Sequence, residues 1–283
     1  MNILTLIKKF QTIDNLIIWV YNISRKKELL MSKTEVKEKV VDLLKEVQPQ
    51  EGKEILAEII QRIDTEEIKK REERLKKIKD LDELFSNQIK KWQEAGCPEQ
   101  VMEMFKLLRD AVTGKAYKIT PGKGNLSFLL CPGKTLSLYS LMAMVHNNNE
   151  VGRVYLLNPN AVIDQIEAPE NPYAIFDVEI GKKTLGKSVK TAAKSIRAKG
   201  RLEIINTESI ALCIQTDVLK EHSVVATGSC CGGDLSVSSA PSVYIDNGGT
   251  PRLEPVAIEE AHLEKGSPSC SSRGFDRQLV VSQ

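Results

Sequence analysis

The sequence predicts an α+β protein in which an all-helical N-terminal region precedes a mixed α/β C-terminal domain. In residues 31–118, charges are dense and apolar side chains recur at helical spacing. After Gly114, short apolar runs, glycines and prolines become frequent. Aromatic residues make up only 5% of the chain, so the core must consist mainly of Leu, Ile and Val. The 283 residues suffice for one sizeable domain or two modest ones.

Residues 1–30 are the part of the sequence that is hardest to assign. Their apolar run, Leu16 to Ile23, is too short to span a bilayer, which takes about 20 residues. No small-residue cleavage site follows it. We therefore predict no transmembrane segment, and two interpretations remain. These residues form an amphipathic helix on a membrane surface or a partner, or they are a mis-annotated start and Met31 is the true first residue. We favour the second interpretation.

Residues 31–118 are predicted to form a charged helical region. Pro49 and Gly52 are expected to end a first helix, and a second begins near Lys53. The run Thr65 to Trp92 holds many favourable i,i+4 ion pairs. Its apolar residues recur every three or four positions: Leu75, Ile78, Leu81, Phe85, Ile89 and Trp92. This apolar stripe indicates either a short coiled coil with a partner or second copy, or a helix docked on the rear domain. Docking is the favoured interpretation.

Residues 119–273 are predicted to form the α+β domain, and residues 274–283 a disordered tail. Another helix is expected before this domain, from Glu99 to Val112. The strands expected in the domain are Ser127–Cys131, Val154–Leu157, Tyr173–Val178, and runs at Val224–Val225 and Val243–Ile245. The helices expected there are Leu136–Val145, residues 187–199 ended by Gly200, and one capped by Asn206 or Thr207.

Charge and cysteine usage exclude several classes of protein. The formal charge is +2, and residues 31–118 carry 19 basic and 19 acidic residues. No segment has the concentrated positive charge of a nucleic-acid-binding protein, so nucleic acid is not a predicted partner. Six irregularly spaced cysteines in a chain of this size indicate reduced thiols in a cytoplasm rather than a disulfide scaffold.

The segment Cys131-Pro-Gly-Lys-Thr135 superficially resembles a phosphate-binding loop. Such a loop needs an earlier glycine, so that its backbone can curl around the phosphates. Phe128, a bulky strand residue, occupies that position. We therefore interpret Gly133-Lys134-Thr135 as an ordinary turn and predict no nucleotide cofactor.

Two polar segments of the C-terminal domain are candidates for chemistry. The first runs from Gly228 to Asp234 and contains Ser229, Cys230 and Cys231. Adjacent cysteines on an extended chain point to opposite faces, so they are poor joint zinc ligands and no metal site is predicted.

The second segment runs from His262 to Arg273 and includes Ser267, Ser269 and Cys270. Its small polar residues, with one His and one Arg, are typical either of an anion site or of a flexible loop. From composition alone, the flexible loop is favoured.

The rear half also resembles an uncharacterised bacterial family that carries a domain of unknown function. The likeness covers about residues 120–273. It is carried by Asn171–Gly181, Ala198–Arg201, Glu208–Leu212, Gly228-Ser229, Gly232–Asp234, Pro251–Leu253, His262, Gly266-Ser267, Ser269 and Arg273. The family has an aromatic-rich stretch around its histidine, where this chain has Glu254–Ala261. The resemblance implies no activity, but it implies an ordered segment from His262 to Arg273.

The sequence therefore leaves two functional hypotheses. The favoured one is a non-catalytic binding or assembly protein, whose residues 31–118 contact a partner or a second copy. The alternative is a ligand-binding domain or enzyme in which the two polar segments converge. In that site His262 would be a general base, Cys230 a nucleophile or metal ligand, and Arg273 an anion clamp. Gly228, Ser229, Asp234, Ser267 and Ser269 would contact the ligand.

Overall fold

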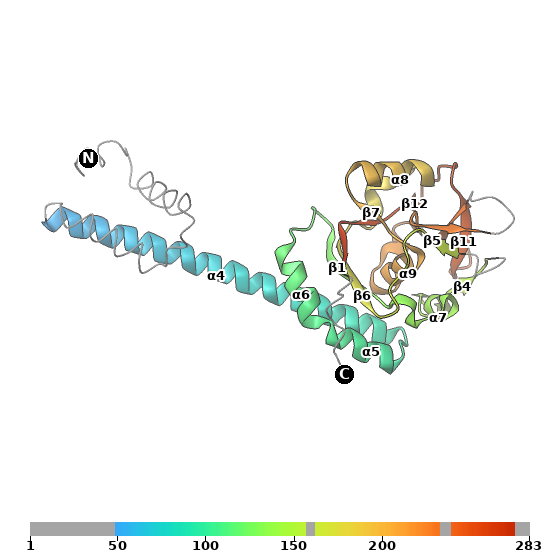
Figure 1. Cartoon of the computed structure of the whole chain (residues 1–283), viewed down its shortest axis with the longest axis horizontal. Coiled ribbons are helices and arrows are strands. Elements are labelled where there is room, and N and C mark those ends of the chain that lie inside the picture. The colour runs from blue at the N-terminus through green and yellow to red at the C-terminus, as the bar shows by residue number, and fades with distance from the viewer. Residues whose placement is uncertain (1–48, 157–161, 233–238, 275–283) are drawn as a thin grey trace. The chain divides into compact units, whose positions relative to one another are not determined.

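The computed structural model describes residues 49–156, 162–232 and 239–274 (Figure 1). The chain divides into two compact units, residues 1–76 and residues 77–283. The second unit contains helices and several small sheets, which confirms the α+β fold class. The predicted first helix, the amphipathic segment 1–30 and the tail 275–283 lie outside the described residues.

In the described residues, three helices precede a mixed region. The helices are α4 (Pro49–Glu94), α5 (Glu99–Leu107), α6 (Arg109–Lys118), α7 (Leu138–Ala143), α8 (Val189–Ala198) and α9 (Asn206–Gln215), with short 3-10 turns η1 (Gly133–Thr135), η3 (Lys182–Thr184) and η4 (Val218–Lys220).

The strands are β1 (Leu126–Cys131), β2 (His146–Asn147), β3 (Glu150–Val151), β4 (Arg153–Val154), β5 (Val162–Asp164), β6 (Tyr173–Val178), β7 (Leu202–Glu203), β8 (Ser223–Val225), β9 (Ser229–Cys231), β10 (Ser239–Ile245), β11 (Pro251–Ala257), β12 (Lys265–Gly266), β13 (Ser269–Cys270) and β14 (Ser272–Gly274). Most are short, and many polar backbone groups therefore need partners from outside the sheets.

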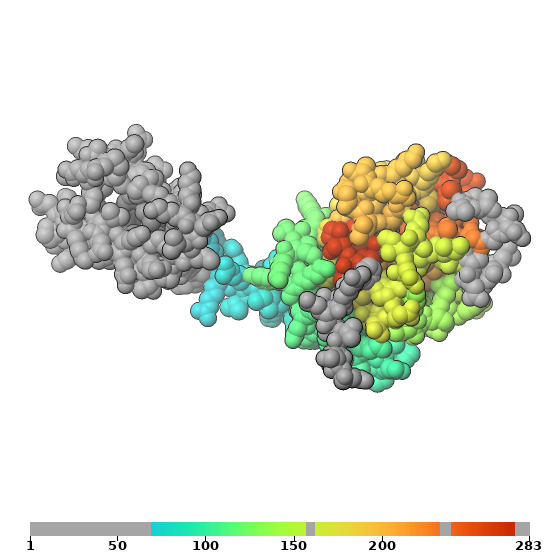
Figure 2. Space-filling model, in the orientation of Figure 1, coloured from blue at the N-terminus to red at the C-terminus, as the bar shows by residue number. Residues whose placement is uncertain are grey.

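Two sheets form the frame of the second unit. In one, β6 is central and pairs antiparallel with both β1 and the C-terminal β14. The other has the order β12-β8-β10-β11-β4. Both faces of β6 are buried, which matches its continuous apolar run. Figure 2 shows the red atoms of the C-terminal strands between the green atoms of α6 and the yellow-orange atoms of α8.

The core is built mainly from β1, β6, α9 and the aromatic residues of the preceding helices. Phe85 and Trp92 of α4 are fully buried, and Trp92 stacks on Phe105 of α5 with ring centroids 5.5 Å apart. Phe85 lies against Phe128 of β1. Residues 77–94 of α4 belong to the second unit, and their apolar stripe packs on the rest of that unit, as the favoured interpretation predicted.

Several predicted boundaries are wrong. The second helix begins earlier than expected, because α4 starts at Pro49 rather than near Lys53 and Gly52 therefore lies inside it. Proline suits the first helical position, and a single glycine costs a helix only about 1 kcal/mol. The helix expected from Glu99 to Val112 is interrupted at Leu108, between α5 and α6.

Two elements of the rear domain are shorter than predicted. The helix expected over Leu136–Val145 is reduced to α7, which begins after its cap Ser137. The strand expected from Val154 is the two-residue β4, which pairs only with Arg252 and Leu253. By contrast, β1, β6 and α8 lie where the pattern predicted them, and Gly200 follows α8 with a φ of +65°.

Candidate functional site at the N-terminus of helix α9

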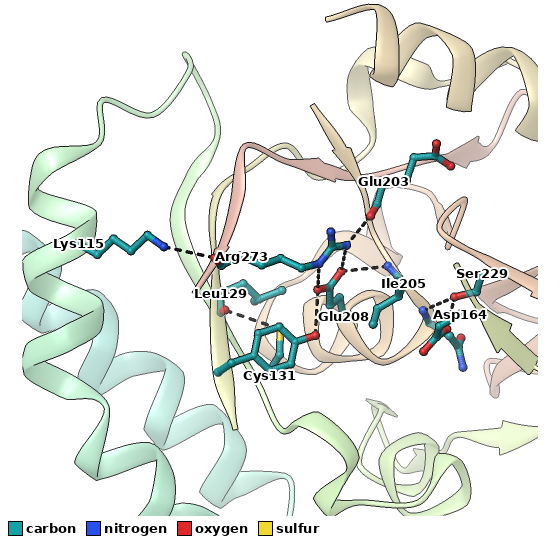
Figure 3. Close-up of polar contacts among 11 residues, drawn as sticks. Lys115, Leu129, Cys131, Asp164, Glu203, Ile205, Glu208, Ser229 and Arg273 are labelled. Carbon is teal, nitrogen blue, oxygen red and sulfur yellow. Dashed lines mark hydrogen bonds and ion pairs between the residues drawn. The ribbon is translucent and has the colours of Figure 1, made fainter. Parts of the chain in front are cut away.

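Several buried polar side chains gather at the N-terminal turn of α9 (Figure 3). Glu208 is 0% exposed, and Asn206 and Glu203 are also buried. The predicted caps, Asn206 and Thr207, are wrong: the residue that precedes the helix is Ile205. Isoleucine has no polar side chain, so the free N–H groups of this turn need partners from elsewhere.

The Glu208 carboxylate accepts a hydrogen bond from one of these N–H groups and from two side chains, Tyr173 and Arg273. Its Oε2 accepts a hydrogen bond from the Ile205 N–H at 3.0 Å. Its Oε1 accepts from the hydroxyl of Tyr173 on β6 at 2.9 Å. Arg273 of β14 completes the set with Nε–Oε1 and Nη2–Oε2 distances of 2.6 and 2.8 Å. This forked geometry satisfies a carboxylate that water cannot reach.

The side chain of Arg273 is buried, and both its guanidinium and its backbone carbonyl form hydrogen bonds. Its side chain is 3% exposed, and Nη2 also donates to the Glu203 carbonyl. Its own carbonyl accepts from Lys115 on α6 at 3.3 Å. Burial alone lowers the pKa of Arg273, but its hydrogen bonds and charge interaction with Glu208 outweigh burial and raise it. The guanidinium is therefore a permanent internal cation, and its Nη1 has no hydrogen-bond partner among the described residues.

Ser229 provides the second distant cap of α9. Its Oγ accepts from the Asn206 N–H at 2.7 Å and donates to Asp164 Oδ1 at 2.5 Å. Burial raises the pKa of Asp164, and the bond from Ser229 opposes that rise. The backbone of Gly228 lies so close to that of Ile204 that a side chain would not fit, because a Cβ there would be 2.9 Å from the Ile204 carbonyl oxygen. Ser229 is consequently a capping residue by geometry.

A second polar network joins β6 to β13. Asp177 adopts a left-handed conformation, with a φ of +51°. It accepts hydrogen bonds from the Gly122 N–H, from Asn125 and, at 2.5 Å, from Arg201 Nη1. Arg201 continues to Ser269, with an Nε–Oγ distance of 2.8 Å. Burial raises the pKa of Asp177, but these hydrogen bonds and the Arg201 charge together lower it.

The two predicted polar segments therefore meet, although not through the predicted catalytic residues. Ser229 and Arg273 both contact the N-terminal turn of α9. His262 lies instead between two carboxylates of its own loop, Glu260 and Glu264, at 3.7 and 4.0 Å. Among the described residues, no hydrogen bond or ion pair joins His262 to Arg273 or Cys230.

Cys230 and Ser267, which were predicted to contact a ligand or metal, form hydrogen bonds with other residues of the protein instead. Cys230 donates to the Ile163 carbonyl across the β5–β9 pair. Ser267 is 4% exposed and exchanges backbone hydrogen bonds with the Thr184 hydroxyl. The segment from Lys265 to Gly274 is ordered, with three short strands, so the flexible-loop interpretation is wrong. Its carbonyls and N–H groups pair with β6, β7 and β8. Asp234 lies outside the described residues.

All six cysteines are free. Burial raises the pKa of the Cys270 and Cys231 thiols to about 12 and about 11, and it also raises the pKa of Cys131 well above its ordinary value. A nucleophilic thiol needs the opposite shift. In the described ranges, no group of three or more His, Cys, Asp or Glu side chains is placed to hold a metal ion.

Gly133-Lys134-Thr135 forms the 3-10 turn η1 after strand β1. Lys134 pairs with Glu167 and Glu170, at 2.6 and 2.9 Å. In a nucleotide-binding loop this lysine would contact a phosphate, but here its ammonium group forms ion pairs with two carboxylates.

Scans against family models, curated proteins and solved structures find no match to this chain. None of the helices in the described ranges is both long and apolar enough to cross a membrane. The α9 site is a set of buried polar residues that hydrogen-bond to one another, while Arg273 Nη1, Asn206 Oδ1 and Glu203 Oε2 have no partner among the described residues. Sequence reasoning missed Asp164, which stands in no motif, and Tyr173 appeared only within the Asn171–Gly181 segment that carries the family resemblance. Asp177, Arg201 and Glu208 appeared only among the residues that carry the family resemblance.

Proposed function

We propose that this chain is a non-catalytic assembly protein that binds a second copy of itself through helix α4. The first support is the state of the residues that a catalytic or ligand site would use. Glu208 and Arg273 are both buried and paired with each other, and Ser229 caps a helix. Groups satisfied in this way stabilise the fold and leave little to offer a substrate.

The observation that carries the proposal is that one part of the α4 apolar stripe is buried and the other part is exposed. Leu81, Phe85 and Trp92 are at most 5% exposed, because they are part of the core of the second unit. Leu75 and Ile78 continue the same stripe but are 57% and 53% exposed. An apolar pair at helical spacing on an otherwise charged helix is the pattern of a helix–helix interface.

Sedimentation velocity of the full-length protein tests the proposal. We expect a dimer at micromolar concentration, and a monomer for the double variant Leu75→Glu/Ile78→Glu. The matched control is Leu107→Glu/Leu263→Glu, which alters two leucines that are 79% and 87% exposed elsewhere. A wild-type protein that stays monomeric, or a control that dissociates as completely as the α4 variant, would contradict the proposal.

The α9 site gives a second candidate function, ligand binding. Arg273 Nη1 and Asn206 Oδ1 are buried and have no hydrogen-bond partner within the described residues. Unpaired buried groups are costly, and a small polar ligand or an ordered water would satisfy them. Native mass spectrometry of gently purified protein decides between the two: a retained small molecule favours a ligand site, and a bare chain mass opposes one.

The finer parts of the sequence interpretation are also proposals. We propose a cytoplasmic location, supported by six free thiols. A bacterial origin rests on the family resemblance, whose Asp177, Arg201, Glu208 and Arg273 are members of the two polar networks. Fractionation of the native host with an antibody against the chain tests the location.

A further inference from the structure

Residues 182–201 concentrate positive charge that counts over longer regions hide. They contain eight basic residues and no acidic residue. The rest of the chain carries 32 basic and 38 acidic residues, so its net charge is negative. The prediction that no segment concentrates positive charge is therefore wrong for these residues.

Six of these basic side chains are exposed on η3, on α8 and just after α8. Helix α8 buries four apolar side chains on its inner face. Lys190, Lys194 and Arg197 recur at i, i+4 and i+7, and they are exposed on the opposite face. Figure 1 shows α8 along the upper edge of the second unit. We call the six exposed side chains the α8 basic face: Lys182, Lys183, Lys190, Lys194, Arg197 and Lys199.

Part of this charge is paired within the protein. Three of the six side chains form an ion pair with a carboxylate: Lys182–Glu221, Lys190–Glu259 and Arg197–Glu203. Lys183, Lys194 and Lys199 form no ion pair with any residue that the structure describes. Glu260 and Glu264 also lie on the segment beside the start of α8, and the unpaired lysines leave the face with a net positive charge. Exposed ion pairs are weak, so the paired lysines also remain available to an anionic partner.

Exposed leucines beside this face favour a lipid surface over a nucleic acid. Leu185, between η3 and α8, is 41% exposed, and Leu263 is 87% exposed. Both lie at the same turn, because a Cβ on Gly186 would be 3.6 Å from Leu263 Cδ2. Leucine side chains insert among lipid headgroups but find no partner in a phosphate–sugar backbone. Residues 182–201 also contain no aromatic side chain on which a base could stack.

We propose that the α8 basic face binds an anionic lipid surface, with α8 lying on the headgroups and Leu185 and Leu263 inserted between them. The apolar face of α8 stays in the protein core, so the contact is peripheral. Lysine is a flexible point charge, which suits fluid headgroups that have no fixed geometry. Each lysine near such a surface strengthens binding about fivefold. The inference is independent of the proposed self-association, because it uses a different surface.

Vesicle flotation of the full-length protein tests the proposal. The probes are vesicles with about 30% phosphatidylserine in phosphatidylcholine, and vesicles of phosphatidylcholine alone, at about 0.1 M salt. We expect binding to the anionic vesicles only, and we expect it to be lost at about 1 M salt because the charges are then screened. Equal binding to both kinds of vesicle, or binding to neither, would overturn the proposal.

Charge variants assign the binding to this face. Lys183→Gln/Lys190→Gln/Lys194→Gln/Lys199→Gln removes four charges and keeps a similar helix propensity, so vesicle binding should fall about tenfold or more. Arginine at the same four positions keeps the charge and should bind like the wild type.

The matched control removes the same number of charges from exposed lysines of α4 and α5, by glutamine substitution of Lys79, Lys90, Lys91 and Lys106. It should bind vesicles like the wild type. A control that binds as weakly as the α8 variant, or an α8 variant that binds as strongly as the wild type, would overturn the assignment to this face.

A DNA duplex is the competing probe, measured by fluorescence anisotropy at the same salt. We expect the anionic vesicles to be bound in preference to the duplex. A protein that binds the duplex through these four lysines, and not the vesicles, would overturn the lipid proposal and assign the face to a nucleic acid.

Discussion

The side-chain amide of Gln88 on α4 forms hydrogen bonds with the backbone of β1 at Leu130, where a neighbouring strand would otherwise pair. Gln88 Oε1 accepts from the Leu130 N–H at 2.9 Å, and Nε2 donates to the Phe128 carbonyl at 2.8 Å. Gln215 of α9 reaches the same edge and donates to the Leu130 carbonyl. These glutamines satisfy backbone groups that an edge strand would otherwise leave unpaired.

Replacing Gln88 tests this relationship. Gln88→Leu keeps the apolar bulk but leaves one buried N–H and one buried carbonyl without partners. Each such group costs about 1–3 kcal/mol, so we expect the free energy of unfolding to fall by about 2–6 kcal/mol. Urea unfolding measures the loss. Gln93→Leu, on the exposed side of the same helix, is the control and should change little. Equal stability of the two variants would show that the amide does not cap β1.

The Arg273–Glu208 pair predicts a non-additive response. Arg273→Met leaves the Glu208 carboxylate buried without its cation, which typically costs about 3–5 kcal/mol. Adding Glu208→Gln should recover part of that loss, because no unpaired charge then remains and the amide still accepts from Tyr173 or Ile205. A double-mutant cycle from urea unfolding measures the coupling. Losses that simply add would contradict a direct interaction.

Asp177 predicts a sensitivity of stability to acid. Its folded-state pKa lies below the ordinary aspartate value of about 3.9. A carboxylate shifted in this direction stabilises the fold at pH above its unfolded pKa, and that contribution is lost as pH falls through the folded pKa. Asp177→Asn tolerates the positive φ and removes only the charge. We expect the stability difference between wild type and variant to shrink from pH 7 to pH 3 in thermal unfolding. With Asp80→Asn, an exposed control on α4, the difference should stay small throughout.

The thiols predict a graded alkylation pattern. Cys131 is fully buried, and Cys213 and Cys270 are at most 7% exposed, so their modification should require unfolding. Cys97 and Cys231 are half-buried, with pKa values raised to about 11, so they should react slowly at pH 8. Pulsed alkylation with peptide mass spectrometry measures the order. Rapid labelling of Cys131 in native protein would contradict this burial.

Local patterns were enough to predict much of the fold. The apolar run of β6 and the helical spacing of α8, followed by Gly200, each lie within a few residues of the observed element. Such signals depend on a residue and its near neighbours along the chain. The second helix was predicted to start near Lys53 but begins at Pro49, because proline suits the first helical position and a single glycine is too weak a signal to end a helix.

The α9 site could be predicted only in part, since its caps come from distant strands. Ser229 is 23 residues from the N–H that it caps, and Arg273 is 65 residues from Glu208. Sequence reasoning singled out Ser229 and Arg273 by residue type but assigned them to a ligand. It could not place Asp164 or Tyr173 beside them, because long-range pairing depends on topology and leaves no local motif.

Replacing glycine by alanine should have opposite effects on stability at Gly266 and at Gly114. Gly266 lies against Gly181, and a Cβ there would be 2.6 Å from the Gly181 carbonyl oxygen and 2.9 Å from His222 Cε1. Gly266→Ala must therefore separate β12 from the backbone beside it, and we expect a loss of about 1–3 kcal/mol.

Gly114 sits within α6, where a Cβ would meet nothing within 4 Å, so Gly114→Ala should stabilise by about 0.5–1 kcal/mol. Thermal unfolding of both variants measures the contrast. A stable Gly266→Ala protein would mean that the C-terminal segment does not pack this closely against Gly181.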